Sequence, residues 1–414
     1  MNLLGNLEII LLVCLSIILI ELFFYMIVKF VNKKFQWLIT KNDECPKLSE
    51  EGIEKFFKHG FDSELGWIRK PNTSHTEQGK YGETKWHTNK IGARINPEFD
   101  NKKSKISCYG DSFTFCRQVN DDETWEYELS KILNTNVINY GVGNYGIDQT
   151  LIRLKREFVK NPTEIVIIGI VPDTISRIMS IWKHYYEYGN TFGFKPRFIL
   201  KNKKLCLIKN IINDKKKFFT YEKYLIDIRK NDFFYKEKFR KEEIHFPHII
   251  TIFKNPSRNF RIIFWVLLIE FLKKINKDVS KIEWNPNKII MKINLMWRIN
   301  LYKNKEVQKL LKEIILNMVN FSKKSNFKLY LVFLPQKDDI LFIKNNFHFY
   351  KEFIEELTKN NDVKIIDLAK NLQYEDDIDE LYSDNNEYGG HYSKNGNKKI
   401  ALGINSELRK DGII

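Results

Sequence analysis

Residues 105–115, KISCYGDSFTF, join a short apolar run to a turn that carries a serine. The run is largely apolar rather than strictly alternating, which is typical of a strand covered on both faces of a sheet. Gly110 allows a tight turn, so Ser112 would stand at the carboxyl end of this strand, where a helix begins. The backbone amides beyond the serine could then face a developing negative charge. An ordinary turn followed by a helix cap has the same pattern.

Four further apolar runs follow, each rich in Val, Ile, Leu and Phe and short enough for a buried strand. Segments with apolar residues three to four positions apart separate them, as expected for helices that cover a core. The five runs are residues 105–109, 137–140, 164–171, 328–335 and 363–368. The helical segments are residues 123–133, 149–158, 307–321 and 349–357. This alternation predicts an α/β fold, a three-layer α/β/α sandwich around a parallel five-stranded sheet, with a site at the carboxyl ends of the strands.

His391 lies in the loop YGGHYSKNGN, residues 388–397, just before a last helical segment. A serine becomes nucleophilic when a base lies within hydrogen-bond reach. A loop after the fifth strand could reach Ser112 across the carboxyl edge of the sheet, so His391 is the candidate base. A lone histidine near a C-terminus is more often solvated and structural. The pairing with Ser112 is what favours catalysis.

A glycine-rich loop follows the second run, in the stretch VINYGVGNYGIDQ at residues 137–149. Gly141, Gly143 and Gly146 would bring backbone amides close to a ligand. No Lys-Ser/Thr pair follows, so the loop lacks the pattern of a nucleotide-phosphate site. The alternative is a plain turn capped by Asp148.

Four motifs in this order resemble the SGNH/GDSL hydrolase superfamily, most closely its membrane-anchored members found among surface-polysaccharide genes. The motifs are DSELGW at 62–67, GDSFTF with ETW at 110–125, NYGVGNYGIDQ at 139–149 and GGHYSKNGN at 389–397. The resemblance implies a flavodoxin-like sheet, an esterase activity and no cofactor. It covers the chain from about residue 61 to 177 and again from about residue 328, but not the stretch between.

The family's roles carry over to matching residues. Ser112 takes the place of the nucleophile, which also lends its backbone N–H to the oxyanion hole, and His391 takes the place of the base. Asn144 stands where the family has its oxyanion glycine, beside Gly143, and a backbone amide can still donate there. The resemblance places Asp111 with these residues in the oxyanion and substrate-binding set.

Two departures from the family affect this site. Thr174 stands where the family usually has asparagine, and its hydroxyl is a shorter donor. Tyr388 stands where the family has its acid, three residues before the histidine. Asp384 or Glu387 could orient His391 instead, or the enzyme could work with a Ser-His dyad. Loss of the orienting carboxylate costs about 10⁴ in turnover in a serine protease, so a missing acid would imply slow hydrolysis.

The five cysteines form neither a CxxC pair nor a His-Cys metal motif, so the sequence indicates no disulfide framework and no metal site. Residues 9–28 are apolar apart from Ser16 and Glu21, and about 20 such residues suffice to span a bilayer. No small-x-small cleavage site follows, so an uncleaved single-pass anchor is expected. Lys29, Lys33 and Lys34 after the span favour a cytoplasmic catalytic domain, whereas the resemblance favours the outer face.

Basic residues concentrate between positions 201 and 300, with 24 Lys and Arg against 10 Asp and Glu, and the rest of the chain is nearly neutral. A lysine-rich solvated face is the simplest interpretation. An anionic membrane surface is an alternative, because residues 260–275 form an apolar helical segment with basic ends, and an anionic glycan is another. No nucleic-acid recognition motif is present, so nucleic acid is an unlikely partner.

We therefore expect an anchor at residues 1–33, an extension packing on the hydrolase domain at 34–104, the hydrolase domain at 105–195 and 306–414, and a helical basic insertion at 196–305. By resemblance, the reaction is hydrolysis of an ester on an acylated carbohydrate, with acetyl as the expected acyl group, by a Ser-His centre. Two alternatives remain: an O-acyltransferase of a surface polysaccharide and a catalytically inactive glycan-assembly module.

Overall fold

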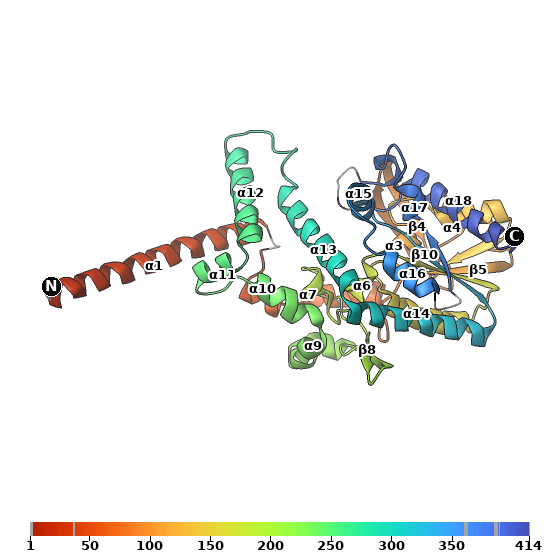
Figure 1. The fold of residues 1–414 in the computed structure, drawn as a ribbon, viewed down its shortest axis with the longest axis horizontal. Coiled ribbons are helices and arrows are strands. Elements are labelled where there is room, and N and C mark those ends of the chain that lie inside the picture. The colour runs from red at the N-terminus through yellow and green to blue at the C-terminus, as the bar shows by residue number, and fades with distance from the viewer. Residues whose placement is uncertain (1–2, 36–37, 360–362, 385–387, 389, 414) are drawn as a thin grey trace. The chain divides into compact units, whose positions relative to one another are not determined.

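The computed structural model describes residues 3–35, 38–359, 363–384, 388 and 390–413, and its chain forms two compact units (Figure 1). Unit 1 consists of Met1–Leu48, Trp182–Phe192 and Leu225–Asn294. Unit 2 consists of Ser49–Ile181, Gly193–Tyr224 and Leu295–Ile414. The ranges predicted from the sequence follow one another along the chain. Each compact unit is assembled from three separate stretches that alternate along the sequence.

Unit 2 contains a parallel five-stranded sheet in the spatial order β6-β5-β7-β10-β11. Its strands are β5 (Ser104–Tyr109), β6 (Asn136–Asn139), β7 (Ile165–Ile170), β10 (Lys328–Phe333) and β11 (Lys364–Asp367). Numbered along the chain, this order is 2-1-3-4-5, which is the flavodoxin-like arrangement. All five predicted strands and the predicted fold class are confirmed.

Helices cover both faces of the sheet, as Figure 1 shows. On one face α4 (Trp125–Leu133) packs against α18 (Lys394–Lys410), and on the other α5 (Ile147–Phe158) packs against α14 (Lys305–Ser325). The central strands are therefore buried on both sides, which explains their continuous apolar runs. The four predicted helical segments correspond to α4, α5, α14 and α16 (Lys351–Lys359).

The remaining elements of the described chain are three two-stranded hairpins, the other helices of unit 2 and the helices of unit 1. The paired strands are β1 (Phe61–Asp62) with β2 (Gly66–Trp67), β3 (Ser74–Gly79) with β4 (Gly82–His87), and β8 (Arg197–Lys201) with β9 (Lys204–Ile208). The other helices of unit 2 are α2 (Glu50–His59), α3 (Ser112–Phe115), α6 (Thr174–Arg177), α8 (Lys215–Phe219), α15 (Lys337–Asn345) and α17 (Ala369–Leu372). Unit 1 contains α1 (Leu3–Lys34), α7 (Lys183–Tyr186), α9 (Leu225–Asn231), α10 (Arg240–Glu242), α11 (His248–Lys254) and α12 (Pro256–Lys274), and α13 (Asn285–Lys303) runs across the division between the units.

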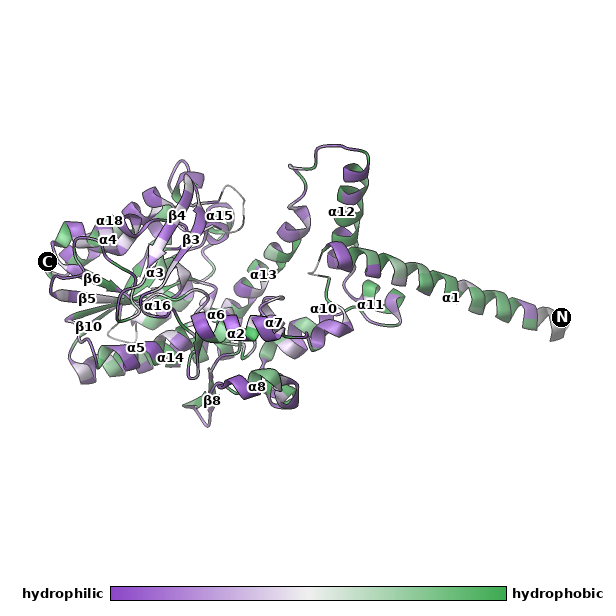
Figure 2. Ribbon diagram, turned by 180° about the vertical axis from the view of Figure 1, so that it is seen from behind, coloured by the Kyte–Doolittle hydropathy of each residue, from purple (hydrophilic) through white to green (hydrophobic). Residues whose placement is uncertain are grey.

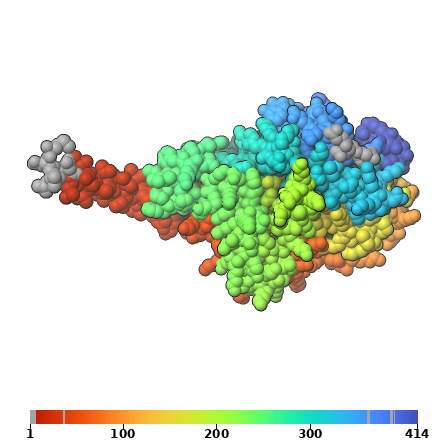
Figure 3. Space-filling view, turned by 60° about the horizontal axis from the view of Figure 1, so that its bottom comes forward, coloured from red at the N-terminus to blue at the C-terminus, as the bar shows by residue number. Residues whose placement is uncertain are grey.

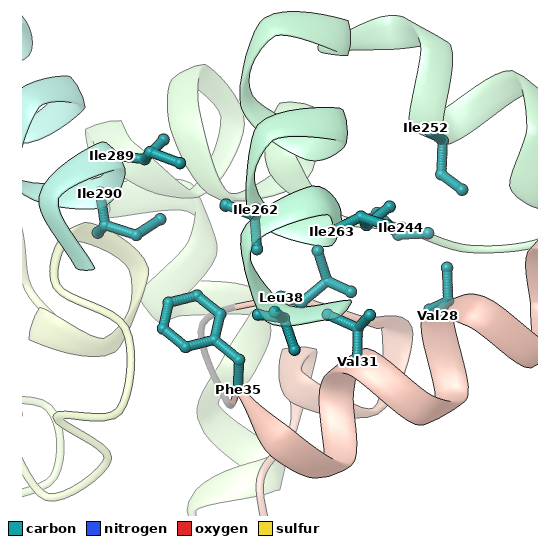
Figure 4. Close-up of a cluster of buried hydrophobic side chains, with 11 residues drawn as sticks. Val28, Val31, Phe35, Leu38, Ile244, Ile252, Ile262, Ile263, Ile289 and Ile290 are labelled. Carbon is teal, nitrogen blue, oxygen red and sulfur yellow. The ribbon is translucent and has the colours of Figure 1, made fainter. Parts of the chain in front are cut away.

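The end of α1 supplies one side of the core of unit 1. Figure 4 shows Val28, Val31 and Phe35 facing isoleucines of α12 and of the start of α13. Closer to the N-terminus of α1, the carboxylate of Glu21 accepts hydrogen bonds from the backbone N–H and the ring of His248, at the start of α11. This contact satisfies the one charged side chain within the apolar stretch.

From Leu7 to Ile20, α1 is largely apolar and exposed, and Figures 2 and 3 show this stretch extending beyond the rest of unit 1. Leu11 and Ile18, for example, are 62% and 61% exposed. Among the described residues, α1 is the one helix long and apolar enough to cross a bilayer. Length and composition therefore make α1 a candidate single membrane span, and a signal sequence would meet the same criteria.

Candidate active site

Ser112 is the first residue of α3, directly after the turn that ends β5. A Cβ on Gly110 would overlap the hydroxyl of Thr114 and lie 2.6 Å from the carbonyl oxygen of Gly169, so only glycine fits this turn. The side chain of Asp111 caps α3 by accepting from the N–H of Phe113 at 2.9 Å. The sequence pattern therefore places Ser112 at the carboxyl end of β5, as expected.

Three side chains from other elements hold the turn after Ser112. The indole N–H of Trp125 donates to the carbonyl oxygen of Phe113 at 3.2 Å, and the amide of Asn139 donates to that of Thr114 at 2.7 Å. The guanidinium of Arg94 donates to the carbonyl oxygen of Phe115 at 2.7 Å. Ser112 thus sits on a rigid support, as a preorganised nucleophile requires.

Asp111 is almost fully buried, and its contacts are within the protein. Besides capping α3, its carboxylate accepts from Arg177 at 2.6 Å, and Arg177 also pairs with Asp173 at 3.0 Å. Burial raises the pKa of Asp111, while the charge of Arg177 opposes this. These contacts hold the turn; the expected contact of Asp111 with substrate stays a prediction.

The glycine-rich loop after β6 lies against the Ser112 turn. A Cβ on Gly141 would overlap the backbone nitrogen of Phe115, and one on Gly143 would lie 4.0 Å from the Cβ of Ser112. Trp67 fixes the loop by donating from its indole nitrogen to the carbonyl oxygen of Gly143 at 2.9 Å. Asn144 has φ of 66°, a left-handed conformation that asparagine tolerates.

Backbone donors without a protein acceptor gather at this contact. In the part of the chain that the structure describes, the N–H groups of Ser112, Gly143 and Asn144 donate no hydrogen bond within the protein. Ser112 is buried and the other two residues are half-buried. These donors are free to bind a developing oxyanion, and their role as an oxyanion hole stays a prediction.

Thr174 contacts the residue that begins α5, directly after the glycine-rich loop. Its hydroxyl oxygen accepts from the N–H of Ile147 at 2.8 Å, and only 3% of the residue is exposed. The hydroxyl therefore secures the start of α5 and, through it, the loop that precedes α5. A direct contribution of Thr174 to the oxyanion hole stays a prediction.

The segment that carries His391 is anchored at the carboxyl ends of the strands. Tyr392 pairs with Tyr382 in an antiparallel bridge, and both hydroxyls donate to the carbonyl oxygen of Pro335, just after β10. The ring of His391 then packs on the ring of Phe113, with 4.8 Å between the centroids. Residues 279 positions apart in the sequence, Ser112 and His391, are thus brought to the same turn. No hydrogen bond joins them in the described structure, and such bonds are often long before substrate binds.

Gln118 orients His391, and sequence reasoning missed this residue. Its side-chain oxygen lies 2.7 Å from Nδ1 of His391 and accepts from the backbone N–H of His391 at 3.0 Å. The backbone N–H of His391 also donates to the hydroxyl of Ser383 at 3.0 Å. The amide nitrogen of Gln118 donates to the carbonyl oxygen of Gln78 at 3.4 Å, which leaves the amide oxygen facing His391, and Nδ1 then carries the proton. Nε2 of His391 is therefore left with a lone pair, as a general base requires.

The expected roles of Asp384 and Glu387 in orienting His391 stay predictions. Gln118 lies against Nδ1, and the carbonyl oxygen of Asp384 accepts from Lys337 at 2.9 Å. A Cβ on Gly390 would lie 2.6 Å from the Cβ of Asp384, so that residue packs beside the histidine loop. Glu387 lies outside the described residues.

Electrostatics keep His391 neutral. Burial lowers its pKa well below the usual value, and the positive charges of Arg117 and Arg177 lower it further. At neutral pH the imidazole is therefore unprotonated and able to accept a proton. Among the described residues, no group of His, Cys, Asp and Glu side chains could hold a metal ion.

Neither a protein-family model nor a curated protein sequence matches the chain. Several solved structures align with it. One is a proposed lipolytic protein of the G-D-S-L family from Desulfitobacterium hafniense, with 13% identity, coverage of 74% of this chain and 99% of that one, and a TM-score of 0.34. An acetyl xylan esterase aligns at 10% identity over 73% and 99% of the two chains with a TM-score of 0.36, and a lipase/acylhydrolase from Enterococcus faecalis at 13% over 74% and 96% with 0.31. Because these scores are low, the assignment of fold and site rests on the contacts of this chain.

Proposed function

We propose that unit 2 is a serine ester hydrolase in which Ser112 is the nucleophile and His391 the general base. The observation that carries the proposal is the double contact of His391 with the side-chain oxygen of Gln118. It leaves Nε2 able to accept a proton beside the turn that presents Ser112. The unpaired N–H groups at the same turn supply the second requirement of acyl transfer.

The reaction proceeds in two half-reactions. Ser112 Oγ bonds to the carbonyl carbon of the ester while Nε2 of His391 takes the hydroxyl proton. The bond to the alcohol oxygen then breaks, and the imidazolium returns the proton to the departing alcohol. Water then attacks the acyl carbon of the acyl-serine while Nε2 of His391 takes a proton from it. The bond between the acyl carbon and the Ser112 oxygen breaks, the imidazolium returns the proton to that oxygen, and the carboxylic acid is released.

The negative charge of each tetrahedral intermediate is held by backbone donors. The N–H groups of Ser112 and Asn144 are the proposed pair, with Gly143 beside them. Removal of a single oxyanion donor costs about 10²–10³ in turnover in a serine protease, so this part of the site supplies a large share of catalysis. The motif resemblance supports an acylated carbohydrate as the substrate class, and acetyl as the acyl group.

A direct test uses full-length protein in detergent micelles with 4-nitrophenyl acetate as substrate. Ser112→Ala should lower kcat/KM by about 10⁶, the scale of nucleophile loss in a serine protease. Ser63→Ala, an exposed serine elsewhere in unit 2, is the matched control and should keep wild-type activity. Equal rates for wild type and Ser112→Ala, with both proteins folded by circular dichroism, would contradict the proposal.

The proposed role of α1 is to anchor the chain in a membrane. Deleting residues 2–20 removes most of the exposed apolar surface of α1. The deletion keeps Glu21, whose carboxylate accepts hydrogen bonds from the start of α11, and it keeps the apolar cluster that begins at Val28. The shortened protein should therefore move from the pelleted membranes to the soluble fraction while keeping its esterase activity, measured by ultracentrifugation and immunoblotting. Continued pelleting of a folded, active protein would show that another surface holds the membrane.

A further inference from the structure

Arg69 lies between β2 and β3 with its guanidinium held over two aromatic rings. Its central carbon is 4.4 Å from the ring centroid of Trp86, on β4, and 4.7 Å from that of Phe115, at the end of α3. The two rings contact each other edge to face at 5.0 Å. Such stacking positions a cation but leaves its N–H groups in need of acceptors.

The guanidinium stands next to the proposed oxyanion hole. A Cβ placed on Gly143 would lie 3.8 Å from Nη2 of Arg69 and 4.0 Å from the Cβ of Ser112. Because both distances are measured from the same point, Nη2 of Arg69 and the Cβ of Ser112 are at most about 8 Å apart. A substituent a few bonds away from the scissile ester could therefore reach Arg69.

Two neighbouring arginines, Arg94 and Arg117, are paired with carboxylates, but Arg69 is not. Arg94 binds Asp121 at 2.9 Å, and the Nε of Arg117 donates to Glu77 at 2.9 Å. Within the described parts of the chain, the Arg69 side chain makes no hydrogen bond and no ion pair. The nearby carboxylate of Glu77 acts to raise the pKa of Arg69, but it is hydrogen-bonded to Arg117 and not to Arg69.

Two N–H donors in this stack are buried without an acceptor, Nε of Arg69 and Nε1 of Trp86. Buried donors normally have partners, and each exception calls for an explanation. Burial lowers the pKa of Arg69 to about 10, with Arg117 adding to the effect, so the group still carries its charge at neutral pH. A desolvated, charged and unpaired guanidinium is the binding group that an anion requires.

We propose that Arg69 binds an anionic substituent of the ester substrate, a carboxylate or a phosphate, close to the scissile bond. This inference rests on the proposed esterase function and narrows its substrate class to acidic acyl esters, such as an acylated sugar that carries a carboxyl or phosphate group. The planar fork of the guanidinium suits both anions. An alternative role, donation to the oxyanion itself, would affect neutral and anionic esters equally.

The test compares three aryl acetates: neutral methyl 4-acetoxybenzoate, anionic 4-acetoxybenzoate and anionic 4-acetoxyphenyl phosphate. The measured quantity is the ratio of kcat/KM for an anionic ester to that for the neutral one. Intrinsic reactivity cancels when this ratio is compared between proteins. Arg69→Gln should lower the ratio at least 10-fold, and Arg69→Lys, which keeps the charge, should retain part of it. The anion with the larger wild-type ratio identifies the carboxylate or the phosphate as the natural group.

Lys85→Gln is the matched control, because Lys85 precedes Trp86 on β4 but its side chain is exposed. This variant loses the same charge and should keep the wild-type ratio. An unchanged ratio in Arg69→Gln would overturn the inference, and so would an equal loss for neutral and anionic esters.

Binding separates failure of this inference from failure of the esterase proposal. Titration of full-length wild type and Arg69→Gln with benzoate and with phenyl phosphate, followed by calorimetry, needs no turnover. If no ester is hydrolysed, weaker binding to Arg69→Gln still supports the anion site, and equal binding overturns it.

Discussion

Unit 2 is built on a parallel sheet whose strand ends collect polar side chains, whereas the core of unit 1 in Figure 4 is made of helix faces lined by aliphatic side chains and one phenylalanine. In a parallel sheet every strand ends at the same edge, so the loops after β5, β6 and β11 meet there although they are far apart in sequence. Helices that pack side by side have no such common edge. The proposed chemistry therefore belongs to the strand ends of unit 2.

The largest expected loss of activity separates a histidine of unit 2 from a histidine of unit 1. His391→Ala should lower kcat/KM for 4-nitrophenyl acetate by about 10⁶, because the nucleophile loses its base. His245→Ala, a half-buried histidine of unit 1, should leave the rate within about twofold of wild type, since it lies outside the proposed site. Comparable losses in both variants would break the division of roles.

A smaller effect is expected at Gln118. Gln118→Leu removes the acceptor that fixes the tautomer of His391, so kcat should fall by up to about 10⁴ with a smaller change in KM. Gln118→Glu keeps an acceptor at the same position and should restore most of the rate. If the leucine variant is folded and as active as wild type, another group orients the histidine.

The smallest effect concerns pH. The base must be neutral, so kcat/KM falls as pH drops through the pKa of His391, and burial with Arg117 and Arg177 holds this acid limb well below the usual pKa of histidine. Arg117→Gln removes a positive charge that disfavours the imidazolium. The pKa should rise, and the acid limb should move to higher pH by about half a unit. Lys131→Gln, at an exposed position on α4, should not move it.

Sequence periodicity was sufficient to predict the five strands, because continuous apolar runs record burial on both faces. The flavodoxin-like sheet was implied by the motif resemblance and not by periodicity. The same strands identified the site candidates in the sequence. Ser112 and the 141–146 loop directly follow predicted strands, and His391 lies in a loop after the last one. Their convergence follows from the sheet and needs no local signal.

Gln118 and Arg69 could not be found in this way. The position of Gln118 depends on its left-handed backbone conformation, with φ of 67°. It also depends on the hydrogen bond that its backbone N–H donates to Glu77 on the β3–β4 hairpin. Arg69 acquires its meaning from the aromatic rings of Trp86 and Phe115, which come from separate elements. Neither residue belongs to a motif, and both depend on side-chain packing that no periodicity encodes.

The most direct measurement of the central claim is covalent labelling of the full-length protein with a fluorophosphonate, followed by peptide mass spectrometry. An activated serine attacks the phosphorus, so the adduct should appear on the peptide that contains Ser112 and be absent from Ser112→Ala. His391→Ala should label far more slowly, because the serine then lacks its base. Equal labelling of wild type and Ser112→Ala, or an adduct on a different serine, would contradict the assignment of the site.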